Sequence, residues 1–154
     1  KAGLKVSTLP AEDRQRWIDT MPNVAAEWIK NNPKVPAREV LAAWRSGVTA
    51  VAACPNITIK LGGIGMPRTG FDWHARGKPI GAEELAASLA PFLTYCIEQF
   101  GPTRCMFESN FPVDKVSYSY VVMYNAFKRL SKGYSAAERA AMFHDTAVRV
   151  YRIV

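Results

Sequence analysis

The stretch that decides the fold is Arg104-Cys-Met-Phe-Glu-Ser-Asn-Phe-Pro-Val-Asp-Lys115. Its opening residues, Arg104 through Phe107, predict a short buried strand. Polar side chains then crowd the carboxyl end of that strand, namely Glu108, Ser109, Asn110 and Asp114. Parallel α/β folds hold their catalytic and binding groups at this end. The segment therefore predicts a candidate site, with one alternative, in which Asn110 and Asp114 only bond the backbone of the turn.

A second strand is predicted upstream by the β-branched run Asn56-Ile-Thr-Ile-Lys-Leu61. A helix over 82–100 joins the two predicted strands and ends at Gly101-Pro102. Further helices are predicted over 37–53, with Val40 and Val51 among its inward residues, and over 117–131. Ser135 and Glu138 predict a capping box, and a closing helix follows from Thr146 to Ile153. This alternation of strands and helices is typical of a parallel α/β sheet.

The predicted α/β unit is incomplete. Two parallel strands do not make a stable sheet alone, and both would have open edges. A closed (β/α)8 barrel has about 250 residues, whereas this chain has 154. We therefore expect the end of something larger, or self-association that covers the open strand edges.

The composition excludes several partners. The net charge of +7 comes from 20 Lys and Arg against 13 Asp and Glu, and it is spread along the chain rather than gathered in one block. This distribution argues against nucleic-acid binding. No apolar run approaches the roughly 18 residues of a membrane span, and no apolar signal segment follows Lys1. We therefore expect a cytoplasmic protein without a membrane or nucleic-acid partner.

The three cysteines, Cys54, Cys96 and Cys105, match no metal-binding spacing. Apolar residues flank each of them, which predicts buried free thiols in a reducing compartment.

Four segments carry a family resemblance: Asn56-Ile-Thr-Ile-Lys-Leu-Gly-Gly-Ile-Gly-Met66, Phe100-Gly-Pro-Thr-Arg-Cys-Met-Phe-Glu-Ser-Asn-Phe-Pro-Val-Asp-Lys115, Asn125-Ala-Phe-Lys-Arg129 and Phe143-His-Asp-Thr-Ala-Val-Arg-Val-Tyr-Arg152. In this order they resemble the sixth strand, the last strand and the closing helices of amidohydrolase-related hydrolases with a TIM-barrel fold. The resemblance implies an α/β fold in which residues 43–154 form the C-terminal portion of a (β/α)8 TIM barrel, incomplete and preceded by a helical N-terminal segment.

The resemblance also implies an activity and a cofactor. The full-length parent would hydrolyse a carboxylic ester, a lactone or a related bond, with water activated by a divalent metal such as zinc or manganese. The family's HxH pair and its middle-strand histidine have no counterpart here, so we expect no metal on this chain alone. The family's last strand usually ends in Ser-Asp, whereas this chain has Ser109-Asn110. An amide cannot act as a general base.

The first part of the chain resembles a different family. The segments Leu9-Pro-Ala-Glu-Asp-Arg-Gln-Arg-Trp17, Met21-Pro-Asn-Val-Ala-Ala-Glu-Trp28 and Val35-Pro-Ala-Arg-Glu-Val-Leu41 are similar to the C-terminal tail of TRAP-transporter solute-binding proteins. This similarity implies a separate helical segment over residues 1–42, and a periplasmic location if it defines the parent. The alternative is an unusual helical insertion before the sixth strand.

Three residues after the last strand are the catalytic candidates. Asn110 stands where the family's Asp would be, and it would orient substrate or water; the alternative is that it caps the turn. Asp114 would recruit a metal or a cation; the alternative is an ion pair with Lys115 or another neighbour. Glu108 would act as an acid or base, because strand alternation gives it the same face as Met106 and Asn110.

Three other residues are the substrate-binding candidates. Lys60 alternates with Ile59 and Leu61, so it would point to the opposite face and bind a substrate carboxylate, or form a structural ion pair. His74 and Arg76 lie in the long loop over 67–81, which would close over substrate in an intact barrel. The alternative for His74 is an ordinary surface histidine.

The sequence thus predicts part of a hydrolase that acts on a small carboxylate or lactone and has no activity by itself. The alternatives are a non-enzymatic fragment of a periplasmic TRAP carboxylate-binding protein and a helical interaction module.

Overall fold

The computed structural model describes residues 36–153 of the chain. Nearly all of the predicted helical segment over 1–42 lies outside these residues. The helices and strands are α3 (Ala37–Ala52), β1 (Ile59–Leu61), α4 (Ala82–Phe100), β2 (Cys105–Phe107), α5 (Tyr120–Leu130), α6 (Ala136–Ala140) and α7 (Thr146–Tyr151). A π-helical turn, Ala141–Asp145, joins α6 to α7.

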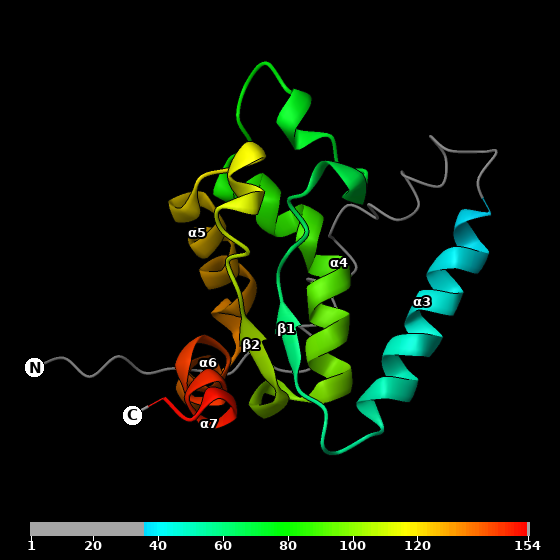
Figure 1. Cartoon of the computed structure of the whole chain (residues 1–154), viewed down its shortest axis with the longest axis vertical. Coiled ribbons are helices and arrows are strands. Elements are labelled where there is room, and N and C mark those ends of the chain that lie inside the picture. The colour runs from blue at the N-terminus through cyan, green and yellow to red at the C-terminus, as the bar shows by residue number, and fades with distance from the viewer. Residues whose placement is uncertain (1–35, 154) are drawn as a thin grey trace, which may run out of the picture.

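Strands β1 and β2 form a parallel pair, with Ile59 opposite Cys105 and Leu61 opposite Phe107. In Figure 1 they lie side by side and point the same way, with α4 making the antiparallel return between them. This confirms the predicted α/β fold with a parallel strand pair. Within residues 36–153 each strand has one strand partner. Self-association through the open edges therefore stays a prediction.

Helix α4 has a clear start and stop in the sequence. Glu83 and Glu84 in its first turn are favourable at the positive end of the helix dipole. Gly101 follows with a φ of 77°, a positive value that glycine adopts without a steric cost. The helix thus ends where the sequence predicts, and β2 begins a few residues later.

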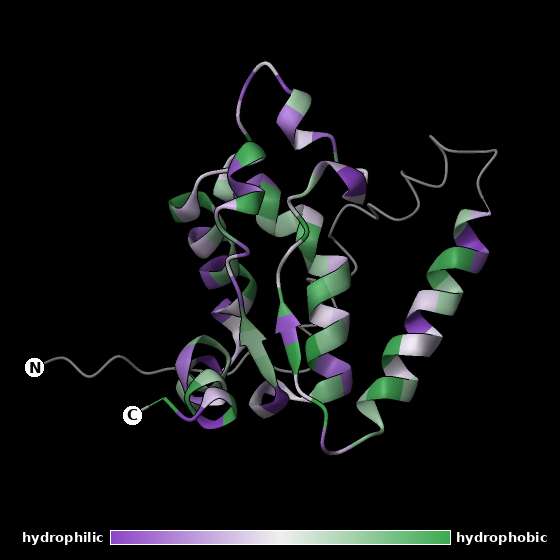
Figure 2. Cartoon of the chain, in the orientation of Figure 1, coloured by the Kyte–Doolittle hydropathy of each residue, from purple (hydrophilic) through white to green (hydrophobic). Residues whose placement is uncertain are grey.

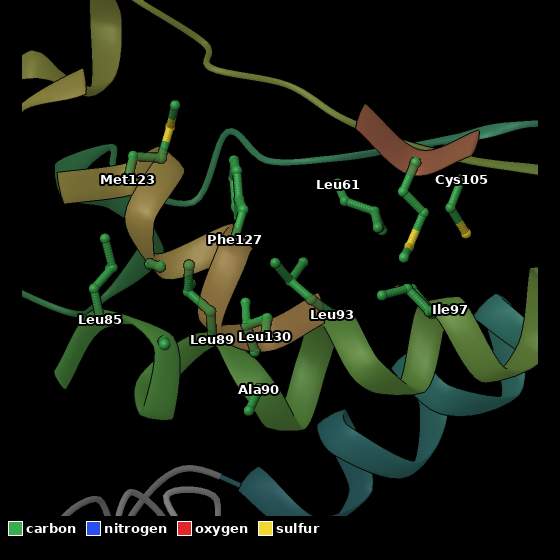
Figure 3. Close-up of a cluster of buried hydrophobic side chains, with 14 of the residues drawn as sticks. Leu61, Leu85, Leu89, Ala90, Leu93, Ile97, Cys105, Met123, Phe127 and Leu130 are labelled. Carbon is green, nitrogen blue, oxygen red and sulfur yellow. The ribbon is translucent and has the colours of Figure 1, made fainter. Parts of the chain in front are cut away.

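The core lies between the strand pair and the helices α4 and α5, as Figure 3 shows. Leu85, Leu89, Leu93 and Ile97 recur at helical spacing along α4 and are buried. They face the strand residues Leu61 and Cys105 and the α5 residues Met123, Phe127 and Leu130. Phe107 of β2 stacks on Phe127, with ring centroids 4.5 Å apart. Burying each large side chain contributes about 1.5–3 kcal/mol, so this cluster fixes the strand pair on the helices.

Figure 2 shows a hydrophilic segment within β1. In the sequence of this strand, Lys60 stands between Ile59 and Leu61. Leu61 is buried among the core residues, whereas Lys60 is exposed. The alternation predicted from the sequence is therefore present, and Lys60 lies on the face of the strand pair away from α4.

Several sequence predictions need correction. Both strands are shorter than predicted, and Arg104 precedes β2 in a 3-10 turn. Val40 and Val51 of α3 are 53% and 43% exposed, because α3 packs on α4 along a different face. Cys54 is exposed, while Cys96 and Cys105 are buried. None of the helices within residues 36–153 is long and apolar enough to cross a membrane.

Candidate functional site

The carboxyl ends of β1 and β2 lie in close contact, and two glycines allow it. The Glu108 N–H donates to the Leu61 carbonyl at 3.2 Å, which extends the strand ladder by one bond. A Cβ atom at Gly62 would lie 2.3 Å from the Glu108 carbonyl oxygen, closer than any side chain tolerates. Gly63 follows with a φ of 72°. The Gly62-Gly63 pair therefore lets the chain leave β1 directly beside the residues that follow β2.

Lys60 and Glu108 form an ion pair on the face of the two strands away from α4. Their side chains are 50% and 25% exposed, so water and a small solute can reach both. The hydrogen bond to Glu108, followed by its charge, raises the pKa of Lys60 above its usual value. The ion pair that the sequence left as an alternative for Lys60 is present, and it brings Lys60 and Glu108 together.

Asp114 is completely buried, in the short turn Val113–Val116 after β2. Its Oδ2 atom accepts hydrogen bonds from the Gly65 N–H at 3.1 Å and from the Tyr118 hydroxyl at 2.9 Å. Its Oδ1 atom accepts from Asn110 Nδ2 at 2.7 Å. Among the described residues these partners are neutral, whereas Lys115 is exposed and forms no ion pair with Asp114. The alternative for Asp114, an ion pair with Lys115 or another neighbour, is therefore absent among residues 36–153.

Asn110 connects this buried carboxylate to the strand ends. Its backbone has a φ of 51°, in the left-handed region that Asn tolerates better than most residues. A Cβ atom at Gly63 would lie 3.8 Å from the Asn110 amide and 3.6 Å from Glu108 Oε1. The side chains of Asn110 and Glu108 therefore both lie beside Gly63, just beyond the end of β1. The structure brings together Lys60, Glu108, Asn110 and Asp114.

Three residues that sequence reasoning did not place in the site complete it: Gly65, Ser117 and Tyr118. Ser117 Oγ donates to the Gly65 carbonyl, so the Gly65 peptide is held on both sides. Burial, followed by the hydrogen bond to Asp114, raises the pKa of Tyr118 well above its ordinary value. The spacing of four residues from Asn110 to Asp114 to Tyr118 was the available signal, because it is the spacing of neighbours along a helical turn.

His74 and Arg76 lie apart from this cluster. Arg76 pairs with Glu84 of α4 at 2.7 Å, and both are exposed. His74 is exposed in the short turn Trp73–Ala75. The buried side chain of Trp73 holds the loop in place. Its ring stacks on that of Phe71, with ring centroids 4.2 Å apart, and its centroid lies 5.8 Å from that of Tyr118. Within residues 36–153 no hydrogen bond or ion pair joins His74 or Arg76 to the strand-end groups, so their role in substrate binding stays a prediction.

The described residues do not form a metal centre. Over residues 36–153 no group of three His, Cys, Asp or Glu side chains lies close enough to hold an ion. The two histidines of the chain, His74 and His144, are both exposed, and His144 pairs with Asp145 at 2.8 Å. Asp114 already accepts three hydrogen bonds from neutral donors. The donor set therefore does not fit a divalent ion, and zinc or manganese in the full-length parent stays a prediction.

Two parallel strands, an intervening helix and a polar cluster at the strand ends are typical of proteins built from βα units. The family model for amidohydrolases matches residues 24–153, and the chain belongs to that family. The second similarity, of residues 1–42 to TRAP solute-binding proteins, stays a prediction, as does the boundary near residue 42.

Relatives and solved structures agree with this assignment. The chain is 38% identical over 110 residues to the uncharacterized protein y4mH of Sinorhizobium fredii, covering 71% of this chain and 33% of that protein. It is 35% identical over 114 residues to L-fucono-1,5-lactonase of Burkholderia multivorans, covering 73% and 36%. Crystal structures of an amidohydrolase from Burkholderia multivorans, one with bound HEPES and one with bound zinc, are 32% identical and superpose with a TM-score of 0.63, covering 74% of this chain and 38% of that one. The chain thus spans about a third of the length of these relatives.

Proposed function

We propose that residues 43–154 contribute two βα units of a TIM-barrel hydrolase that opens lactones or cleaves related carboxylic esters. The observation that carries the proposal is the convergence of Lys60, Glu108 and Asn110 at the carboxyl ends of two adjacent parallel strands. This is the end at which barrels of parallel strands bind and convert their substrates. The 35% identity to an L-fucono-1,5-lactonase supports a lactone as the substrate class.

Each group has a proposed role. Water attacks the lactone carbonyl carbon, a new C–O bond forms, the ring C–O bond breaks, and a proton of the water ends on the released alkoxide. Glu108 is the group that accepts and returns that proton. Lys60, held beside Glu108, binds the carbonyl oxygen of the lactone or the carboxylate of the product. Asn110 orients a ligand hydroxyl.

The test of ligand binding uses L-fuconate, the acid formed when L-fucono-1,5-lactone opens, because it cannot hydrolyse further. NMR titration of the full chain is expected to shift the backbone signals of Gly62, Gly63 and Glu108. Lys60→Met removes the cation and is expected to weaken binding about tenfold, the size of one charge-assisted hydrogen bond. Lys78→Met is the matched control, since Lys78 is exposed in the loop over 67–81. Equal affinity of Lys60→Met and wild type would overturn the proposal.

Turnover is tested separately. The full chain is given L-fucono-1,5-lactone in a pH-stat, with and without added zinc. We expect no rate above uncatalysed hydrolysis, because the described residues assemble no metal centre. A zinc-dependent rate that Glu108→Gln abolishes would show that the chain is a complete hydrolase by itself.

The non-enzymatic alternatives make a different prediction. An interaction module that covers the open edges of β1 and β2 by pairing with a second copy would be a dimer in solution. Light scattering that gives the mass of one chain at high protein concentration would exclude it.

A further inference from the structure

We propose that Asp114 is a positioning residue: it fixes the side-chain amide of Asn110 so that the Asn110 carbonyl oxygen is offered as a hydrogen-bond acceptor to a ligand hydroxyl at the ends of β1 and β2. The identity of the ligand, a hydroxylated acid or its lactone, rests on the proposed function. The orientation of Asn110 rests only on contacts within the chain.

Asp114 is a fully buried carboxylate. Its side chain is 0% exposed, and among the described residues no cation pairs with it. A buried carboxylate is stable only when hydrogen-bond donors surround it. The three donors come from different parts of the chain: Gly65 follows β1, Asn110 follows β2, and Tyr118 precedes α5. Asp114 therefore ties the two strand ends to the start of α5.

The chemistry of the carboxylate decides which way the amide of Asn110 points. The oxygens of Asp114 accept hydrogen bonds from three donors. The Asn110 atom that donates to Asp114 Oδ1 at 2.7 Å is the amide nitrogen, so the carbonyl oxygen of Asn110 points to the other side. Among the described residues no donor bonds to that oxygen, and no buried side-chain polar atom lacks a partner. The oxygen is thus accessible and available as an acceptor.

The surroundings of this oxygen suggest the ligand class. Asn110 and Glu108 border the same point near Gly63, and Glu108 is paired with Lys60. A ligand placed there meets an acceptor amide, a carboxylate and an ammonium group. A hydroxylated carboxylic acid matches this set, because its hydroxyls donate and its carboxylate accepts.

The variant Asp114→Asn tests whether Asp114 sets the orientation of the Asn110 amide. In that variant the carbonyl of the new amide must remain with the Gly65 N–H, which is a fixed donor. The amino group of the new side chain then faces Asn110, and two donors meet. Asn110 relieves this by turning its amide over. Its amino group would then face the ligand in place of the acceptor oxygen.

An exchange variant separates positioning from stability. In the single variant Asn110→Asp, two carboxylates face each other where Asn110 now donates to Asp114 at 2.7 Å. We expect this variant to be less stable than wild type, because the two negative charges repel. Asn110→Asp combined with Asp114→Asn restores one donor and one acceptor at this contact. The carboxylate at position 110 then leaves an oxygen free to accept from the ligand, as in wild type.

The experiment is an NMR titration of the full chain with L-fuconate. Asp114→Asn is expected to weaken binding about tenfold, and the exchange variant to recover to within about threefold of wild type. Asp72→Asn, the same change at an exposed residue, is the matched control and should bind as wild type does. An exchange variant that binds as weakly as Asp114→Asn would overturn the proposal.

A second readout keeps the result independent of the proposed function. The Asn110 side-chain amide in wild type should show one proton shifted downfield and exchanging slowly with water, because it is bonded to Asp114. Asp114→Asn should remove that signature, while Asp72→Asn should leave it. If wild type does not bind L-fuconate, the proposed function fails, and this amide signal still decides the positioning role. An Asn110 amide unchanged by Asp114→Asn would overturn it.

Discussion

The guanidinium of Arg104 donates to the carbonyl oxygen of Ala52 at 2.9 Å, which fixes the end of α3 to the start of β2. The same group donates to the Cys54 and Phe100 carbonyls, each at 2.9 Å. Arginine suits this position because its planar fork carries several donors in fixed directions. One side chain therefore satisfies carbonyls at the ends of α3 and α4 together.

Arg104→Met should consequently destabilise the protein by about 1.5–3 kcal/mol, the range for hydrogen bonds to a charged group. For a chain of this length that loss corresponds to a fall in melting temperature of about 2–4 °C per kcal/mol, measured by circular dichroism. Arg129→Met is the matched control, since Arg129 is exposed on α5. Equal melting temperatures of the two variants would contradict this role for Arg104.

Gly62 tests the close approach of the two strand ends. In Gly62→Ala the new methyl group would overlap the Glu108 carbonyl, and backbone cannot move aside as a flexible side chain can. We expect a loss of about 1–3 kcal/mol in urea unfolding, together with shifted NMR signals at Lys60 and Glu108. Gly77→Ala is the control, because a Cβ atom there meets nothing within 4 Å. A Gly62→Ala variant as stable as Gly77→Ala would show that the strand ends are not packed as described.

Tyr118 should make the folded protein less stable as the pH rises into the alkaline range. Its pKa is raised by burial and by Asp114, so the folded state keeps the hydroxyl protonated when the unfolded chain ionises. This contribution is fully present below a pH of about 10, the ordinary pKa of tyrosine, and is lost as the pH rises further.

Tyr118→Phe should therefore lower stability at neutral pH by about 1.5–3 kcal/mol, because Asp114 loses a donor. Its stability should also fall less steeply than that of wild type above a pH of about 10. Urea unfolding between neutral and alkaline pH measures both effects. Tyr151→Phe, at an exposed position, should follow the wild-type curve. Parallel curves for Tyr118→Phe and wild type would be incompatible with a protonated, buried hydroxyl.

How far the sequence predicts this structure depends on the range of the interaction. Helix α4, its end at Gly101 and the capping box of Ser135 with Glu138 are local features, and all three are confirmed. The closing helix predicted over Thr146 to Ile153 begins at Thr146 but ends at Tyr151. It continues directly from the π-helical turn, and no side-chain cap forms at its start.

The contact of Asp114 with Gly65 could not be predicted in the same way. The Gly65 N–H that bonds it lies 49 residues earlier, and the pairing exists only once β1 and β2 are adjacent. The segment after β2 could be identified as a polar strand end because its residue types are local. Which of its side chains is buried and which stays partly exposed depends on residues 62–65, which follow β1, and no local pattern encodes that contact.

The ion pair between Lys60 and Glu108 gives a final prediction, which separates function from stability. Both side chains reach solvent, so their interaction should stabilise the fold by less than about 1 kcal/mol and should weaken further with added salt. A double-mutant cycle with Lys60→Met, Glu108→Gln and the combined variant measures this coupling in urea unfolding. The same variants should each weaken L-fuconate binding about tenfold. A coupling energy of several kcal/mol with unchanged binding would assign the pair a structural role instead.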